Sequence, residues 1–219
     1  MIAMKKKYVL GLTLAVTLWI GGSAIAASLQ DEAASFVESV IRVSIYQDED
    51  GFVERVPGGA DTPEAHMFAK QQKQEFTEDL IKEIRKTYKD TTGVDIPGGL
   101  AVAVANGLEK ALKLTTYRID NVQKIDDHFY VVYVAIRGLD RNELIKQQEL
   151  RLQKERKGGM TKEAETFQLA GIEADSYANA TPDDVKKQET IVPVQVFIKN
   201  GVYTLPSKDD FIPYFAGTK

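Results

Sequence analysis

Residues 128–139 read HFYVVYVAIRGL, and this stretch decides the fold class. Aromatic and β-branched residues, which favour strands, fill most of it. Both alternating sets of positions are apolar, which is typical of a strand buried on two sides rather than one. The pattern therefore predicts a central strand that is covered on each of its faces.

Strand signals continue on both sides of this stretch. Three further strands are predicted, at residues 115–122, 190–199 and 202–205. The last two are joined by Asn200-Gly201, and Asn-Gly between apolar residues is the strongest short-range signal of a β-hairpin. Pro193 has no backbone donor, so we expect it at a sheet edge or a bulge.

Apolar residues at three- and four-residue steps predict helices before and between the strands. They cover residues 31–46, 63–92, 98–114, 141–157, 161–180 and 209–215. Asp61 is the expected cap of the second helix, and Gly107 is a weak point in the third. The acidic and glycine-containing residues 48–59 predict a loop, with a short extended piece at residues 52–56. Helices first and antiparallel strands later indicate an α+β fold, with a helical insertion at about residues 141–188.

The amino terminus has the pattern of a secretory signal peptide. Three lysines, Lys5 to Lys7, precede an uncharged apolar run at residues 8–20, and small residues follow up to Ala26. We therefore expect residues 1–26 to be a leader that is cleaved after Ala26, and residues 27–219 to be a single exported domain. The alternative is a retained membrane anchor, because the apolar run nearly reaches the roughly 20 residues that span a bilayer.

Composition excludes several classes of partner and site. The chain has no cysteine, so it offers neither disulfides nor the lipobox cysteine of a lipoprotein. Its net charge is −4, and loss of the three leader lysines makes the rest more acidic. An acidic surface argues against nucleic acid and against electrostatic binding to anionic membranes. His66 and His128 are far apart in sequence, so no metal site and no cofactor is predicted.

Three stretches carry a resemblance to known proteins: SFVESVIRVSIYQDE (35–49), YRIDNVQKIDDHFYVVYVAIRGLD (117–140) and VPVQVFIKNGVYTLPSKDDFIPYFAG (192–217). The order of elements resembles the nuclear transport factor 2-like superfamily, which implies amino-terminal helices packed on a curved, cone-like antiparallel sheet. More narrowly, the stretches resemble an uncharacterised family of secreted or lipid-anchored Gram-positive proteins that share a domain of unknown function. Members of that family often carry a lipobox cysteine and a tryptophan after the hairpin turn, where this chain has no cysteine and Tyr203. The resemblance brings no known activity.

The strands supply a candidate ligand-binding set: Asp120, Phe129, Tyr133, Phe197 and Tyr203. Core packing is the favoured role of the aromatic side chains, and the alternative is that they line the mouth of a cone-shaped pocket. No catalytic residue is assigned. The sequence therefore favours an exported non-catalytic module that binds a small molecule or a protein. Two alternatives are an isomerase- or hydrolase-like pocket enzyme that uses Asp120 and Tyr133, and a structural subunit that forms a homodimer.

Overall fold

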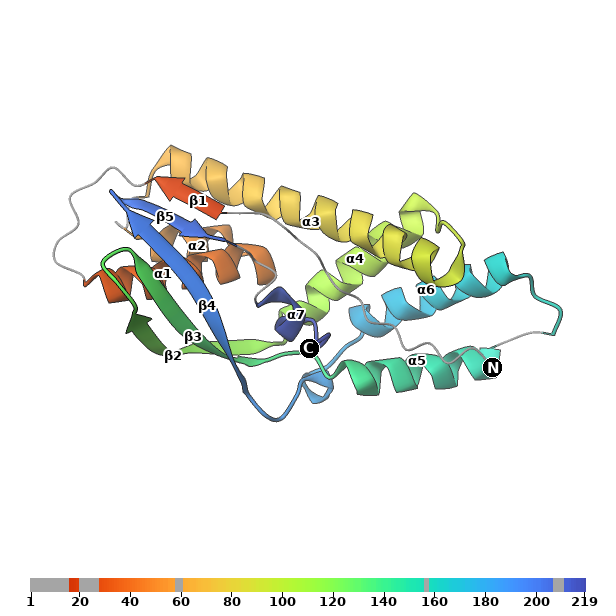
Figure 1. Cartoon of the computed structure of the whole chain (residues 1–219). Helices are drawn as coiled ribbons and strands as arrows, with labels where there is room; N and C mark the ends of the chain where they lie inside the picture. Colours follow the sequence, from red (N-terminus) through yellow and green to blue (C-terminus); the bar gives the residue numbers. More distant parts are fainter. Residues whose placement is uncertain (1–15, 20–27, 58–60, 156–157, 207–210) are drawn as a thin grey trace.

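The computed structural model describes residues 16–19, 28–57, 61–155, 158–206 and 211–219. The expected leader therefore lies mostly outside the described residues, and only residues 16–19 of it are placed. The fold is α+β: helices pack on one side of an antiparallel sheet, and a helical pair inserted between two strands extends to one end of the molecule (Figure 1). The α+β prediction is confirmed.

The sheet has the strand order β1-β5-β4-β3-β2, and all neighbours are antiparallel. The strands are β1 (Val16–Trp19), β2 (Thr116–Lys124), β3 (Phe129–Arg137), β4 (Thr190–Lys199) and β5 (Val202–Leu205). Asn200 and Gly201 both have positive φ, as the tight turn between β4 and β5 requires. Pro193 lies beyond the last β4–β5 pair, Phe197 with Thr204, so the predicted edge position is correct.

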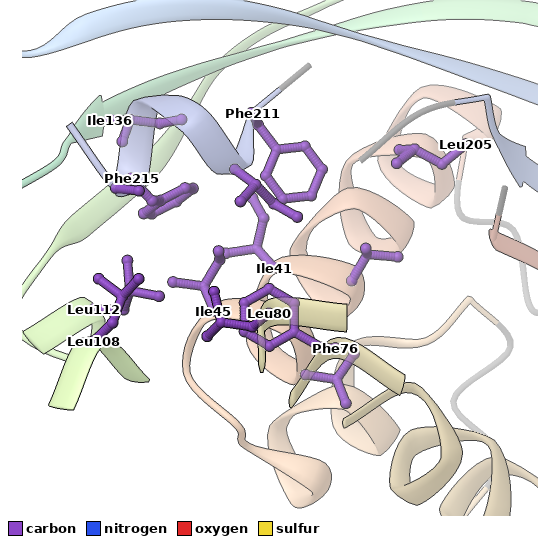
Figure 2. Packing of buried hydrophobic residues seen from close by; sticks show 14 of the residues in the cluster. Ile41, Ile45, Phe76, Leu80, Leu108, Leu112, Ile136, Leu205, Phe211 and Phe215 are labelled. Carbon is purple, nitrogen blue, oxygen red and sulfur yellow. The ribbon is translucent and has the colours of Figure 1, made fainter. Parts of the chain in front are cut away.

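The helices are α1 (Leu29–Ile45), α2 (Glu49–Arg55), α3 (Pro63–Thr92), α4 (Gly98–Leu112), α5 (Arg141–Glu155), α6 (Lys162–Ala178) and α7 (Ile212–Phe215). A capping box between Ser28 and Asp31 starts α1, which lies against the sheet. Its buried stripe meets side chains from α3, β3 and α7 in one core (Figure 2). Residues shown there include Ile41, Ile45, Phe76, Leu80, Ile136, Phe211 and Phe215. The helix-facing side of the sheet is thus filled by packed side chains.

Residues 49–55 form helix α2, so the predicted loop with an extended piece is wrong. Asp48 caps this helix by accepting a hydrogen bond from the Gly51 backbone at 2.9 Å. Phe52 is fully buried, and its ring stacks on that of Phe68 with centroids 5.6 Å apart. The acidic residues that indicated a turn are instead the cap and first turn of a short helix, where negative charge is favourable. Burial of Phe52 then stabilises a helix too short to form alone.

The cap of α3 is Thr62 rather than Asp61. The Thr62 hydroxyl accepts a hydrogen bond from the Ala65 backbone at 3.2 Å. Asp61 instead approaches the His66 ring, with 2.7 Å between carboxylate oxygen and Nε2. Both residues are good cap formers, so the local pattern alone did not separate them.

Strand β3 is central but is covered on one face only, which corrects the prediction of two covered faces. Tyr130, Val132 and Val134 are buried under the helices, whereas Phe129 and Tyr133 on the other face are only half-buried. The strands make their main helix contacts with α1 and α7, which lie on the same side. The second apolar face of β3 is therefore largely uncovered among the described residues, although its Ala135 is buried.

Of the two inserted helices, α6 packs onto α4 and α5 packs onto α6. Gly107 of α4 is the point of close approach: a Cβ added there would lie 2.7 Å from the Ala174 carbonyl oxygen of α6. Gly107 is therefore a packing requirement, not the weak point that helix propensity indicated. Of the helices within the described ranges, none is both long and apolar enough to span a bilayer.

Candidate functional site

The candidate site is the open face of the sheet, meaning the side that faces away from α1 and α7. The alternation of β3 and β4 defines it, because successive side chains point to opposite faces. Val192, Val194 and Val196 of β4 are buried under the helices, and the intervening residues are exposed. On β3 and β4 the open face therefore carries Phe129, Val131, Tyr133, Ala135, Ile191, Pro193, Gln195 and Phe197, of which Ala135 is buried.

A stacked aromatic pair lies on this open face. Phe129 and Phe197 are directly opposite each other in the β3–β4 register. Their ring centroids are 4.7 Å apart and the rings are inclined by 10°. Phe197 is 41% exposed and Ile191, further along β4, is 54% exposed. Side chains this apolar are exposed singly on many proteins, so the stacked pair, rather than exposure alone, distinguishes this face.

Polar groups accompany the apolar ones on the open face. Tyr133 lies opposite Pro193, and its hydroxyl donates a hydrogen bond to the side-chain oxygen of Gln123 at 3.0 Å. Gln195 is opposite Val131. Amide and hydroxyl groups beside aromatic rings give a surface that can form directional hydrogen bonds as well as apolar contacts.

Charged side chains border the open face at the end where Ile191 lies. Asp120 falls at a β-bulge between Ile119 and Asn121, and its carboxylate accepts a hydrogen bond from Arg118. Glu189 contacts the same guanidinium at 3.0 Å, and these two carboxylates raise the pKa of Arg118. Asp120 is therefore held in an exposed ion-pair network. The pocket-enzyme hypothesis needs it in an apolar cavity instead.

Tyr203 lies on the opposite, helix-covered side of the sheet from the other four predicted residues. Its ring is 5.5 Å from that of Phe36 in α1, and its hydroxyl donates to Glu32 at 2.6 Å. Burial and the Glu32 carboxylate raise the pKa of Tyr203. The fold thus brings Phe129, Tyr133 and Phe197 onto one surface with Asp120 at its border. Ligand binding by these residues stays a prediction.

A buried polar cluster is a feature that sequence reasoning missed. Tyr88 of α3 donates a hydrogen bond to Glu173 of α6, and both side chains are buried. Tyr177, one turn further along α6, has its pKa raised by burial and by Glu173. Arg141, at the start of α5, is also buried beside them. The residues come from three helices far apart in sequence, so no local motif announces the cluster.

The cavity beside this cluster is small. Its volume is about 20 Å³, and its walls include Leu80, Ile84, Val104 and Leu108. That is room for about one water molecule rather than an organic ligand. The cluster therefore joins the helical insertion to the rest of the core.

A wider groove of about 280 Å³ runs along α3, lined by Ile81, Lys82, Arg85, Lys86, Lys89 and Asp95. Arg85 binds Asp95 through a bidentate pair at 2.9 Å. Lys82 and Lys86 pair with Asp79 and Glu83 on the same helix. These ion pairs offset much of the positive charge, so the groove is a solvated charged face. Across the described part of the chain, no group of three or more histidines and carboxylates could hold a metal ion.

No family model matches the chain, and no curated protein matches it. Among solved structures, it is similar to a candidate lipoprotein, ycdA, from Bacillus subtilis subsp. subtilis strain 168. The two share 13% sequence identity with a TM-score of 0.59, and the likeness covers 83% of this chain and 53% of that one. The chain therefore spans about half the length of that protein. At this identity the likeness shows a shared fold.

Proposed function

We propose that this protein is an exported, non-catalytic module that binds a partner protein through the open face of its sheet, at the cell envelope or outside the cell. The three lysines, apolar run and small residues up to Ala26 support export by a cleaved leader. The shared fold with a candidate lipoprotein supports an envelope setting. Helices packed on one side of an antiparallel sheet support membership of the nuclear transport factor 2-like superfamily.

The observation that carries the proposal is the stacked pair Phe129–Phe197 on an uncovered sheet. Aromatic residues at the centre of a patch, with charged groups at its border, are the usual composition of a protein–protein interface. The helix-facing side of the sheet is packed with side chains, and the cavity beside Glu173 has room for only about one water molecule. A macromolecular partner therefore fits the open face better than a small molecule enclosed in the fold.

Crosslinking in cells tests this proposal. The photoreactive amino acid p-benzoylphenylalanine replaces Phe197 in the full chain, expressed in the bacterium that produces the protein. The matched control places it at Leu150 of α5, which is 59% exposed and apolar. We expect a specific crosslinked species from position 197 and none from position 150. Equal crosslinking from both positions, or none from position 197, contradicts the proposal.

Binding measurements with the identified partner then test the aromatic pair. The double substitution Phe129→Ser and Phe197→Ser should weaken binding at least tenfold, because aromatic residues dominate interface energies. Leu150→Ser should leave the affinity unchanged. Sedimentation of residues 27–219 tests whether the partner is a second copy of the same chain. If the domain is a dimer and the double substitution dissociates it, the partner is a second copy. Mass spectrometry of the exported protein should place its first residue at Ala27.

A further inference from the structure

The outer edge of β5 is occupied by the short strand β1. Residues Val16 to Trp19 (VTLW) pair antiparallel with β5, in the register Val16 to Leu205 and Trp19 to Val202. β5 pairs with β4 on its other side, so β1 is the terminal strand of the sheet (Figure 1). The strand comes from the apolar run of the expected leader. Removal of that leader after Ala26 therefore removes one strand of the sheet.

The described core and the first helix cap lie after the expected cleavage site. The core cluster of the described residues extends from Ala33 to Ala216. Helix α1 begins at its own cap, Ser28, which follows the expected cleavage site. A chain of residues 27–219 therefore retains this core and the helix caps. It differs from the full chain in the freed edge of β5.

The two edges of the sheet are built differently. β2, the opposite edge, has a bulge beside Asp120 and carries Arg118 and Lys124, and bulges and charges are the usual protection against pairing with another chain. β5 (VYTL) has no charge, no proline and no bulge in its pairing with β4. After leader removal, its backbone N–H and C=O groups are left unpaired along an apolar strand. Such an edge is a template for an added strand.

We propose that leader removal opens β5 as an acceptor site for an extended apolar segment of a partner protein, which adds antiparallel to it as β1 does. This inference rests on the export proposed above. Thr204 lies opposite Phe197, so an added strand continues the open face from β4 through β5. The partner then gains backbone hydrogen bonds at the edge and aromatic contacts on the face. The leader itself keeps the site closed in the precursor.

The sequence supplies a direct probe for this site. Trp19 is the single tryptophan of the chain, so residues 27–219 contain none. A synthetic peptide of residues 14–20 (LAVTLWI), with added terminal lysines for solubility, carries the only tryptophan in a mixture with that domain. We expect its fluorescence anisotropy to rise saturably as the domain is added. Circular dichroism of the domain confirms that it is folded.

Backbone methylation of the peptide distinguishes strand pairing from unspecific apolar binding. In a hairpin with a two-residue turn, the two residues that flank the turn form hydrogen bonds with each other. The direction of the backbone N–H and C=O groups then alternates along the strand, so those of Tyr203 and Leu205 point away from β4. Leu18 lies opposite Tyr203. N-methylation at Leu18 should therefore reduce affinity at least tenfold. N-methylation at Thr17, whose N–H points away from β5, should leave it unchanged.

A second experiment compares the full chain with the domain. The full chain contains Trp19 itself, so the peptide carries a fluorescein label in this experiment. Because β1 occupies the edge, residues 1–219 should bind this peptide at least tenfold more weakly than residues 27–219. The proposed acceptor site is refuted if the peptide shows no saturable binding to residues 27–219. It is also refuted if both methylated peptides lose affinity equally. The crosslinking at position 197 is an independent readout, so it can succeed when the peptide arm fails. Failure of export itself would instead appear as a retained amino terminus on the cellular protein.

Discussion

The substitution Gly107→Ala should destabilise this protein although it improves helix propensity. Alanine is favoured over glycine in a helix interior by about 0.8–1.0 kcal/mol. Against this gain, the new Cβ would lie 2.7 Å from the Ala174 carbonyl oxygen, 3.1 Å from the Tyr177 Cβ and 3.3 Å from the Ala178 backbone nitrogen. Two of these three neighbours are backbone atoms that cannot rotate away. Overpacking of this kind costs about 1–3 kcal/mol, so we expect a net loss of up to about 2 kcal/mol.

Gly171 provides the matched control on the partner helix. It also lies inside a helix, α6, but an added Cβ there would meet nothing within 4 Å. Gly171→Ala should therefore raise stability by about 0.5–1 kcal/mol through helix propensity alone. The same substitution is thus expected to change stability in opposite directions at the two positions. The reason is the close packing of α4 against α6 at Gly107.

Urea unfolding and thermal unfolding of residues 27–219, both followed by circular dichroism, measure the two variants. For a domain of this size, 1 kcal/mol corresponds to a shift of about 2–4 °C in Tm. We expect Gly171→Ala to raise Tm and Gly107→Ala to lower it, with similar unfolding slopes. An increase for Gly107→Ala as large as that for Gly171→Ala would refute the argument, because it would mean that the two helices can separate at no cost.

Three other substitutions test the buried contacts. Tyr88→Phe removes the donor to the buried Glu173 carboxylate, so the free energy of unfolding should fall by about 1.5–3 kcal/mol in urea titrations. Gly138→Ala places a Cβ 1.8 Å from the Tyr214 carbonyl oxygen, so α7 should be displaced and limited proteolysis near the carboxyl terminus should accelerate. Burial raises the pKa of Tyr46 to about 12, so between pH 10 and 12 the folded state keeps a proton that the unfolded state loses. Stability should therefore fall as pH rises through this window. The urea midpoint should be lower at pH 11 than at pH 9, and Tyr46→Phe should make this difference smaller.

Local signals were sufficient for most of the secondary structure. The helix that became α1, the central strand β3 and the hairpin at Asn200-Gly201 were all predicted from spacing and turn chemistry. These features depend on residues within a few positions of each other, and their apolar periods of 3.6 and 2 are distinct. Helix α2 was missed because its acidic cap resembles a turn and its stabilising contact, Phe52 on Phe68, is made with another helix.

The candidate site was only partly predictable. The aromatic residues were recognised as a group, but alternation does not tell which of two apolar faces a helix will cover. Phe129 and Phe197 were therefore expected in the core or at the mouth of a pocket, and the structure places them on the open face. Tyr203 was grouped with them, yet it meets Glu32, which is 171 positions away in sequence.

The sequence by itself determined the α+β class, the order of helices and strands apart from β1 and α2, and the pattern of a leader at the amino terminus. The tertiary structure alone decided that α1 and α7 cover one side of the sheet and leave the other open. It also decided that Gly107 is a helix contact and that Tyr88 and Glu173 form a buried pair. The physical reason is that periodicity reports how much apolar surface an element must bury. The choice of what buries it depends on contacts between residues far apart in the chain.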